Sequence, residues 1–327
     1  ASNNNIVVTG KVDGNITGGE GNTSANANTI IIGESVGGNI IGGKANQDTA
    51  NTGEVSITAI ENVIDIGGSV EGNVTGGIGK SDAGNNNIHI TGSVGGSVIG
   101  GKSETGTATK NDIIIAGSVS GSVIGGEANT SANENLISVG GNVSGNVIGG
   151  KANLDATGTD GTKITAIGNI IDISGSVDGN VTGGEANTNA DENFISVKGN
   201  VGGNIIGGKS ETGTAAFNDI IIGGDVNGSI IGGEGNTNAN ENHISVEGSV
   251  DGNITGGKSN TSASENFISV EGNVGGNITG GEGNTSANEN LISVGGNVAG
   301  NVIGGKAEQD AANTGEAKIT AIGNFID

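Results

Sequence analysis

The stretch Asn135-Leu-Ile-Ser-Val-Gly-Gly-Asn-Val-Ser-Gly-Asn-Val-Ile-Gly-Gly150 decides the fold, because close variants of it occur twelve times in this 327-residue chain. Each copy ends in a Gly-Gly doublet, and successive doublets lie 24, 25 or 34 residues apart. A period in this range is typical of proteins in which each repeat stacks only on its neighbours. The sequence therefore predicts a one-dimensional array rather than two globular domains.

The residues before each doublet alternate with period two. Positions are counted back from the first Gly of the doublet. In all copies, the residues two and ten positions back are Ile or Val, the residue six back is Val, and the residue twelve back is Ile. Gly lies four residues back in every copy and eight back in all but one, where Glu34 replaces it. Strict alternation indicates extended strands with one buried face, which β-branched residues suit. Inward Gly at fixed places marks corners where the backbone turns.

We therefore predict an all-β, single-stranded parallel β-solenoid (β-helix) of about twelve coils of 24–25 residues, with some longer coils of 34 residues. Residues 1–327 form one continuous repeat domain, open at both ends, with a polar third side after each doublet. Longer connections at 45–61, 152–168 and 307–323 add about ten residues each, interpreted as an extra strand or small flap. One coil buries roughly four β-branched side chains at about 1.5–3 kcal/mol each, too little to order itself, so stability must come from stacking.

An Asn lies fourteen residues before the doublet in every copy. Its phase is inward, so we interpret the row as a structural ladder: Asn at a bend, in left-handed backbone angles, hydrogen-bonded along the stack. A row of ligand-binding amides is the alternative. The members are Asn4, Asn28, Asn62, Asn86, Asn111, Asn135, Asn169, Asn193, Asn218, Asn242, Asn266 and Asn290.

The residue directly after each doublet forms a row that we call the charge ladder. Its members are Glu20, Lys44, Ile78, Lys102, Glu127, Lys151, Glu185, Lys209, Glu234, Lys258, Glu282 and Lys306. Stacking places these side chains side by side, where alternating signs attract. Exposed pairs contribute only about 0–1 kcal/mol each, so the ladder sets register more than stability. It begins with Glu20 and ends with Lys306, which predicts a head-to-tail contact between molecules whose bare strand edges invite pairing.

Composition narrows the function. The 35 acidic residues, 12 Lys and no Arg give a formal charge of −23, which disfavours nucleic acid and anionic membrane surfaces. No apolar run is long enough to insert into a membrane, and the absence of Cys excludes a thiol nucleophile. The two histidines, His89 and His243, occupy outward positions without a catalytic cluster. We therefore predict that the protein is not an enzyme.

Two binding functions are remote alternatives. A calcium β-roll needs Gly-Gly-x-Gly-x-Asp, but Gly-Gly-Glu-Gly-Asn at 18–22 has Asn there. Carboxylates such as Asp65, Asp172 and Glu134 point outward, so we expect no cofactor beyond weak Ca²⁺ association. Ice binding would need a continuous Thr row, whereas the position before the doublet holds Thr in five copies and Ile in seven. Outward Phe194, Phe267 and Phe325 share one position, which predicts either a lateral contact stripe between rods or a surface covered by the flap or third side.

The pattern Asn-x-Ile-x-Val-x-Gly-x-Val-x-Gly-Asn-Val-x-Gly-Gly resembles the repeats of bacterial autotransporter passenger domains and haemagglutinin-type surface adhesins. The resemblance covers the whole chain and implies secretion, an extracellular rod on the bacterial cell surface and no cofactor. We expect a structural, self-associating surface fibre or stalk whose partner is itself, head to tail and laterally. An adhesin module that binds glycans or neighbouring cells through its polar third side is the alternative.

Overall fold

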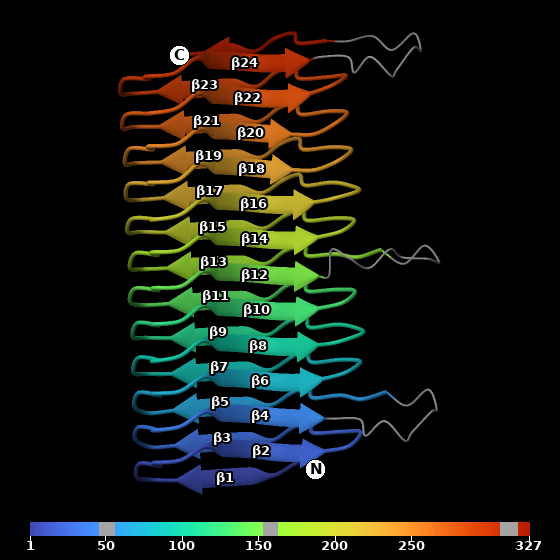
Figure 1. The fold of residues 1–327 in the computed structure, drawn as a ribbon, viewed down its shortest axis with the longest axis vertical. Helices are drawn as coiled ribbons and strands as arrows, with labels where there is room; N and C mark the ends of the chain where they lie inside the picture. The colour runs from blue at the N-terminus through green and yellow to red at the C-terminus, as the bar shows by residue number, and fades with distance from the viewer. Residues whose placement is uncertain (46–55, 153–162, 308–319) are drawn as a thin grey trace.

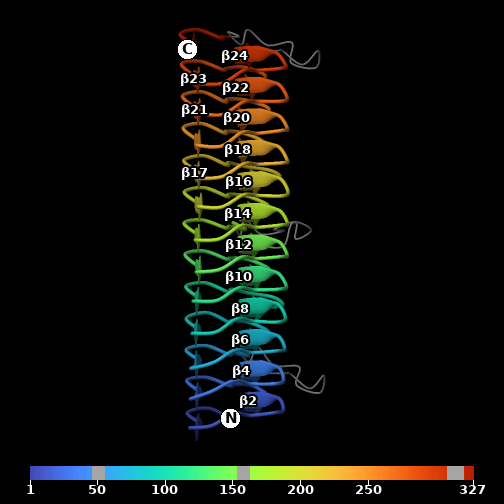
Figure 2. The ribbon, with the colours of Figure 1, turned by 90° about the vertical axis from the view of Figure 1, so that its left-hand side faces the viewer.

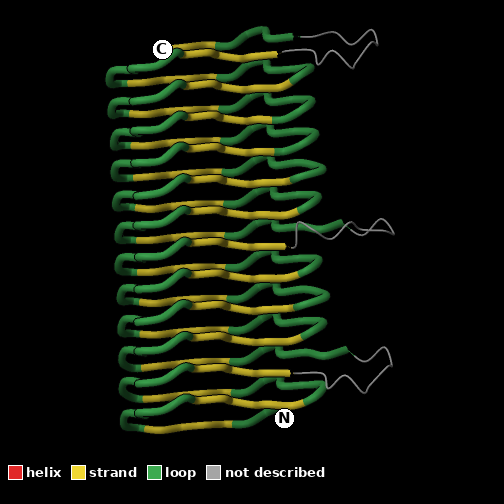
Figure 3. Tube along the Cα trace, viewed as in Figure 1, coloured by secondary structure: helices red, strands yellow, loops and turns green. Residues whose placement is uncertain are grey.

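The computed structural model describes residues 1–45, 56–152, 163–307 and 320–327. Within these ranges the chain forms only strands, turns and loops (Figure 3). It winds into a straight rod with its two termini at opposite ends, and each lap gives one strand to each of two parallel sheets (Figure 1). The predicted parallel β-solenoid of about twelve laps is therefore confirmed.

The odd-numbered sheet holds thirteen strands, stacked in chain order. They are β1 (Asn5–Val8), β3 (Thr29–Ile32), β5 (Val63–Ile66), β7 (Asn87–Ile90), β9 (Asp112–Ile115), β11 (Leu136–Val139), β13 (Ile170–Ile173), β15 (Phe194–Val197), β17 (Asp219–Ile222), β19 (His243–Val246), β21 (Phe267–Val270), β23 (Leu291–Val294) and β25 (Phe325–Ile326). The even-numbered sheet holds twelve. They are β2 (Ile16–Gly21), β4 (Ile40–Ala45), β6 (Val74–Gly79), β8 (Val98–Ser103), β10 (Val123–Ala128), β12 (Val147–Ala152), β14 (Val181–Ala186), β16 (Ile205–Ser210), β18 (Ile230–Glu234), β20 (Ile254–Lys258), β22 (Ile278–Gly283) and β24 (Val302–Ala307).

The strands pair in the register that the repeat predicts. In the even-numbered sheet Val123 lies beside Val98 on one side and Val147 on the other. In the odd-numbered sheet Ile137 lies between Ile113 and Ile171, although 34 residues separate it from the latter. Side chains one lap apart therefore stack directly, because the extra residues of the longer laps do not shift the strands.

Two single-residue bridges complete each lap. Between the sheets, the Gly-x-Val-x-Gly turn places Val143 beside Val119 and Val177. On the polar side, Ser131 lies beside Thr107 and Thr165. The turns between the two sheets line one edge of the rod, and viewed from that edge the sheets form two facing layers (Figure 2). The polar third side is therefore present, as a row of single bridges rather than a third sheet.

The interior is divided by residue size. The Ile and Val side chains of both sheets and of the turn form one continuous core from Ile16 to Ile292. Beneath the polar side the core consists mainly of small residues, with Ala108, Ala132 and Ala190 fully buried. Small side chains there let the third side lie close to the sheets, so the lap closes tightly.

The longer connections rejoin the ordinary lap. Thr58 takes the bridge position between Ser24 and Asp82, and Thr165 and Thr320 occupy equivalent positions. Ile57 and Ala59 are buried beside it. The described end of each connection is thus the usual third side and not an extra strand. The rest of the predicted insertions, residues 46–55, 153–162 and 308–319, lies outside the described residues.

Candidate functional site

The inward Asn row forms a continuous hydrogen-bonded ladder inside the rod. Asn135 is 1% exposed, and its Oδ1 accepts hydrogen bonds from the Nδ2 and the backbone N–H of Asn111, both at 3.0 Å. Its own Nδ2 donates to Asn169 Oδ1 at 2.9 Å, and its backbone N–H donates to the same atom at 3.1 Å. The same contacts link Asn4 to Asn28 and Asn290 to Asn324. Because these amides serve one another within the buried stack, they are not available to a ligand.

The Gly-Gly doublets make room for this ladder. Both glycines of a doublet turn toward the interior, where a side chain on Gly126 would overlap the carbonyl oxygen of Ala108 and lie 2.8 Å from Asn135 Nδ2. A Cβ on Gly125 would lie 2.7 Å from Asn135 Cβ. The doublet and the inward Asn that follows it in the next copy of the repeat, here Asn135, are therefore two halves of one packing unit.

The left-handed backbone angle falls one residue earlier than predicted. Positive φ occurs at the residue before each inward Asn, for example 54° at Glu134 and 58° at Phe217, and not at the Asn. Gly168 and Gly323 occupy the same position in longer laps, with φ of 65° and 71°. The corner turns before the chain enters the odd-numbered sheet, so that the Asn amide can point inward from an extended backbone.

The charge ladder lies along the outer face of the even-numbered sheet. Lys44 contacts Glu20 at 3.2 Å, and Lys258 contacts Glu234 at 3.3 Å. These side chains remain 31–61% exposed, so each pair contributes little to stability. Glu20 on β2 and Lys306 on β24 lie at opposite ends of the sheet, and Lys306 contacts Glu282 at 3.2 Å. Their contact between molecules therefore stays a prediction.

A second outward row on the same sheet carries no charge. We call it the Thr/Ile row, and its members are Thr17, Ile41, Thr75, Ile99, Ile124, Ile148, Thr182, Ile206, Ile231, Thr255, Thr279 and Ile303. Stacked members adjoin directly, as Ile124 does Ile148. Only the two glycines of the doublet separate this row from the charge ladder, so no side chain stands between them.

Two further polar rows, which period-two alternation of hydropathy does not reveal, hold the stack together. Asn146 Oδ1 accepts the backbone N–H of Asn180 at 2.8 Å, and Ser122 Oγ accepts that of Asn146 at 3.1 Å. A parallel row four residues earlier works in the same way, with Ser118 Oγ accepting the N–H of Asn142. Every member of the first row is Asn or Ser, which was the available signal. In the second row Lys11 and Asp225 depart, although Asp225 Oδ1 still accepts the backbone N–H of Ser249 at 2.7 Å. A hydrogen bond with Asp13 raises the pKa of Lys11.

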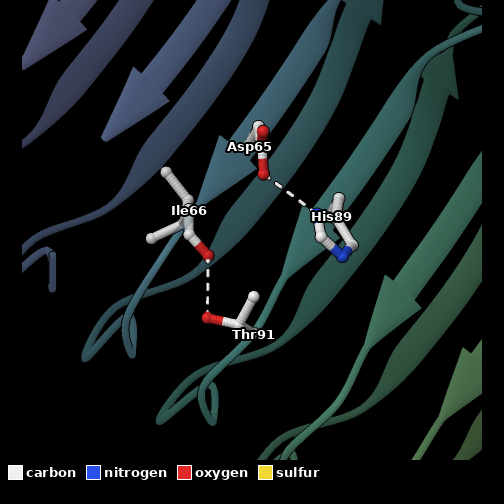
Figure 4. A network of polar contacts seen from close by, with 4 residues as sticks. All are labelled: Asp65, Ile66, His89 and Thr91. Atoms are coloured by element: carbon white, nitrogen blue, oxygen red, sulfur yellow. Dashed lines mark hydrogen bonds and ion pairs between the residues drawn. The ribbon is translucent and has the colours of Figure 1, made fainter. Parts of the chain in front are cut away.

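Both histidines pair with an aspartate of the preceding lap on the odd-numbered sheet. His89 Nδ1 lies 2.9 Å from Asp65 Oδ1, while nearby Thr91 donates a hydrogen bond to the carbonyl of Ile66 (Figure 4). His243 Nδ1 lies 2.7 Å from Asp219 Oδ1. The two pairs are several laps apart and share no third polar group, so the structure does not bring the histidines together.

The predicted aromatic stripe lies on the odd-numbered sheet. Phe194 stacks beside Ile170, Phe267 beside Leu291, and Phe325 follows Leu291. The rings of Phe267 and His243 lie 5.0 Å apart. Phe217 instead occupies a left-handed corner and is 52% exposed. Acidic residues interrupt the stripe, and burial raises the pKa of one of them, Asp112.

An open groove follows the charge ladder on its outer side. One stretch of this groove has a volume of about 570 Å³. It is lined by Lys209, Ser210, Glu211, Glu234, Gly235, Asn236, Lys258, Ser259, Asn260, Glu282 and Asn284. Both charge signs and several amides thus face one shallow channel.

The described residues lack two features that metal binding and membrane insertion would need. No group of three or more His, Asp or Glu side chains in these ranges could hold a metal ion. Across the same ranges, no helix has the length and hydropathy to cross a bilayer.

Comparison with known proteins gives one solved structure. No protein-family model matches the chain, and no curated protein matches it. The chain is similar to the crystal structure of a hyperactive, Ca²⁺-dependent, β-helical antifreeze protein from an Antarctic bacterium. The identity is 21%, the TM-score is 0.36, and the match covers 91% of this chain and 82% of that one. The strand order and registers described above confirm the expected β-solenoid repeat fold, whereas the autotransporter or haemagglutinin assignment stays a prediction.

Proposed function

We propose that this chain is a structural, non-enzymatic rod that self-associates into an extracellular fibre or surface stalk. One observation carries the proposal: the inward Asn of every lap, and the outward Asn and Ser side chains of nearly every lap, bind the neighbouring lap. Asn135 binds Asn111 and Asn169, and Asn146 binds Asn180. Because these side chains bind the neighbouring lap, they stabilise a long and stiff rod, and every added lap repeats the same contacts.

The distribution of reactive groups supports a role without catalysis. The buried Asn amides hydrogen-bond to one another in the inward ladder. Most lysines of the charge ladder contact a glutamate of a neighbouring lap. The two His–Asp pairs lie on separate laps. A formal charge of −23 keeps the remaining surface hydrated, which suits a secreted rod in contact with water on all sides. Ca²⁺ would bind only weakly, to surface carboxylates.

Glycan binding is the second candidate, and the groove favours it. Asn236 and Asn260 hydrogen-bond to each other in its lining, which also includes Glu234 and Lys258. Such donors and acceptors, repeated at about 4.8 Å per lap, suit a polyhydroxylated chain that runs along the rod. The groove holds no aromatic side chain, which lowers the affinity expected for sugars.

Ice binding has less support. Thr residues of the Thr/Ile row are adjacent only at Thr255 and Thr279. Ile interrupts the row elsewhere, so it offers no continuous array of hydroxyl groups to an ice lattice.

Electron microscopy of the purified chain, with sedimentation velocity across a concentration series, tests the proposal. We expect rods of constant width that associate as concentration rises, with far-ultraviolet circular dichroism typical of strands. Dispersed single rods at every concentration would refute self-association. Selective binding on a glycan array would favour the adhesin, and thermal hysteresis would favour ice binding.

A further inference from the structure

The outer face of the even-numbered sheet combines two rows with different chemistry. The Thr/Ile row is β-branched and uncharged throughout, and the charge ladder beside it alternates in sign at all but one lap. Since only buried glycines lie between the rows, both are open to a partner. We propose that this face binds a second copy of the same chain, lying alongside it and running in the opposite direction. The inference deepens the proposed function, on which it rests, by naming the surface and the partner.

The charge distribution selects this face for contact between copies. Six of the twelve lysines in the chain belong to the charge ladder, but only five of its 35 acidic residues do. The face is therefore nearly neutral, whereas the molecule as a whole carries −23. Two such molecules repel each other at long range. They meet with the least repulsion where the lysines gather.

The order of the two rows selects the antiparallel direction. When two identical faces meet with both rods running the same way, the left-to-right order of the rows is reversed in the partner. The charge ladder then faces the Thr/Ile row, or one of them faces nothing. Turning the partner end over end keeps the order, so that Thr/Ile meets Thr/Ile and charge meets charge. Only this arrangement avoids burying charges against apolar side chains.

The alternation of sign then selects the register. With β12 facing β14 of the second copy, Lys151 lies opposite the partner's Glu185, and Glu127 on β10 lies opposite the partner's Lys209. A slip by one lap places β12 opposite β12, and Lys151 then faces Lys151. Like charges across an interface oppose binding, so registers of the first kind are favoured at every second lap. Because its charges alternate in sign, the ladder favours matched registers of the partner chain over registers shifted by one lap.

A charge swap tests whether the alternating charges select the register of the partner. The variant Glu127→Lys/Lys151→Glu/Glu185→Lys/Lys209→Glu keeps alternation within its four laps and creates only two exposed like-charge contacts at their borders. We expect parent chains to bind parent chains and swapped chains to bind swapped chains. Mixed pairs should bind more than about tenfold more weakly, measured by fluorescence energy transfer between labelled populations. Circular dichroism checks that the swapped chain folds.

Cysteine cross-linking tests the arrangement independently, because the chain has no Cys. A chain carrying Ile148→Cys should form disulfides with a chain carrying Ile124→Cys, Thr182→Cys or Ile231→Cys, according to register. It should not cross-link with itself or with Ile206→Cys, since disulfides require Cβ atoms within about 4.5 Å, less than one lap. Cross-linking of Ile148→Cys with itself or with Ile206→Cys, but not with the other three variants, would overturn the proposal.

The outcomes also separate this inference from the proposed function. If the chain assembles but parent and swapped chains mix equally well, the proposed interface is wrong and the fibre forms through another surface. A chain that stays monomeric at all concentrations overturns both the interface and the self-association. The variant Ile148→Asp, which places a charge in the Thr/Ile row, should stay folded and lose assembly. Unchanged assembly of this variant would also refute the proposal.

Discussion

Removing one amide from the middle of the inward ladder should strongly destabilise the rod. The substitution Asn135→Ala deletes the Oδ1 that accepts two hydrogen bonds from Asn111, one from its Nδ2 and one from its backbone N–H. It also deletes the Nδ2 that donates to Asn169. Asn111 and Asn135 are 0% and 1% exposed, so water cannot replace the lost partner without opening the stack.

The magnitude follows from the number of orphaned donors. A buried polar group left without a partner costs about 1–3 kcal/mol, and Asn135→Ala leaves two such donors on Asn111. Asn169 Oδ1 keeps the backbone N–H of residue 135, so it adds little. The expected loss is about 2–6 kcal/mol in the free energy of unfolding, before the small cavity is counted.

Chemical denaturation followed by circular dichroism measures the loss, and hydrogen exchange shows whether the laps around residue 135 open separately from the rest, as repeat arrays can. The matched control is Asn146→Ala in the same lap. Asn146 is exposed and accepts one backbone N–H from Asn180, which water can serve instead, so we expect a loss below about 1 kcal/mol. Equal losses in the two variants would show that the inward ladder contributes nothing particular.

Other substitutions test the remaining features. Gly126→Ala should prevent normal folding, because its Cβ would overlap the carbonyl of Ala108. Gly14→Ala should be tolerated, because no atom lies within 4 Å of the added Cβ, and thermal unfolding of the two variants tests the difference. Gly168→Ala should cost about 1–2 kcal/mol through its φ of 65° alone, because the nearest atom to a Cβ is 3.8 Å away, and an unchanged denaturation midpoint would contradict this. Burial raises the pKa of Asp112. Its protonated form therefore contributes fully to the free energy of unfolding at acid pH, and this contribution is lost as the pH rises through the raised pKa. Asp112→Asn should therefore stabilise the rod at neutral pH but not at acid pH, and a melting-temperature series against pH checks the sign.

The lap architecture could be predicted because one physical signal dominates the sequence. Period-two alternation fixes which side chains are inward, and the constant offset between Asn and doublet fixes their stacking. Ile137 and Val139 are buried and stack on their equivalents one lap away, as expected. A residue repeated at one phase in every copy needs no knowledge of distant contacts, because its neighbours are its own copies.

Features that depend on backbone detail could not be predicted in the same way. The left-handed angle at Glu134 is invisible in the alternation, since Glu, Ala, Lys, Phe and Gly all occupy that corner. The outward Asn and Ser rows do not stand out by hydropathy, because what their members share is hydrogen-bonding capacity. Asn146 and Ser122 differ in size but share an oxygen that accepts the N–H of the next lap. By contrast, His243 and Asp219 occupy the same position in adjacent laps, so their pairing follows from the register of the repeat.

The two kinds of polar row act in opposite directions along the rod, and this bears on its function. Each inward Asn oxygen accepts hydrogen bonds from the lap before it, as Asn135 does from Asn111. Each outward oxygen accepts one from the lap after it, as Asn146 does from Asn180. Every interior lap therefore binds both neighbours through its side chains as well as through its strands. Since the contacts are the same at each step, the number of laps can set length without altering local stability. These repeated contacts fit the structural rod proposed above.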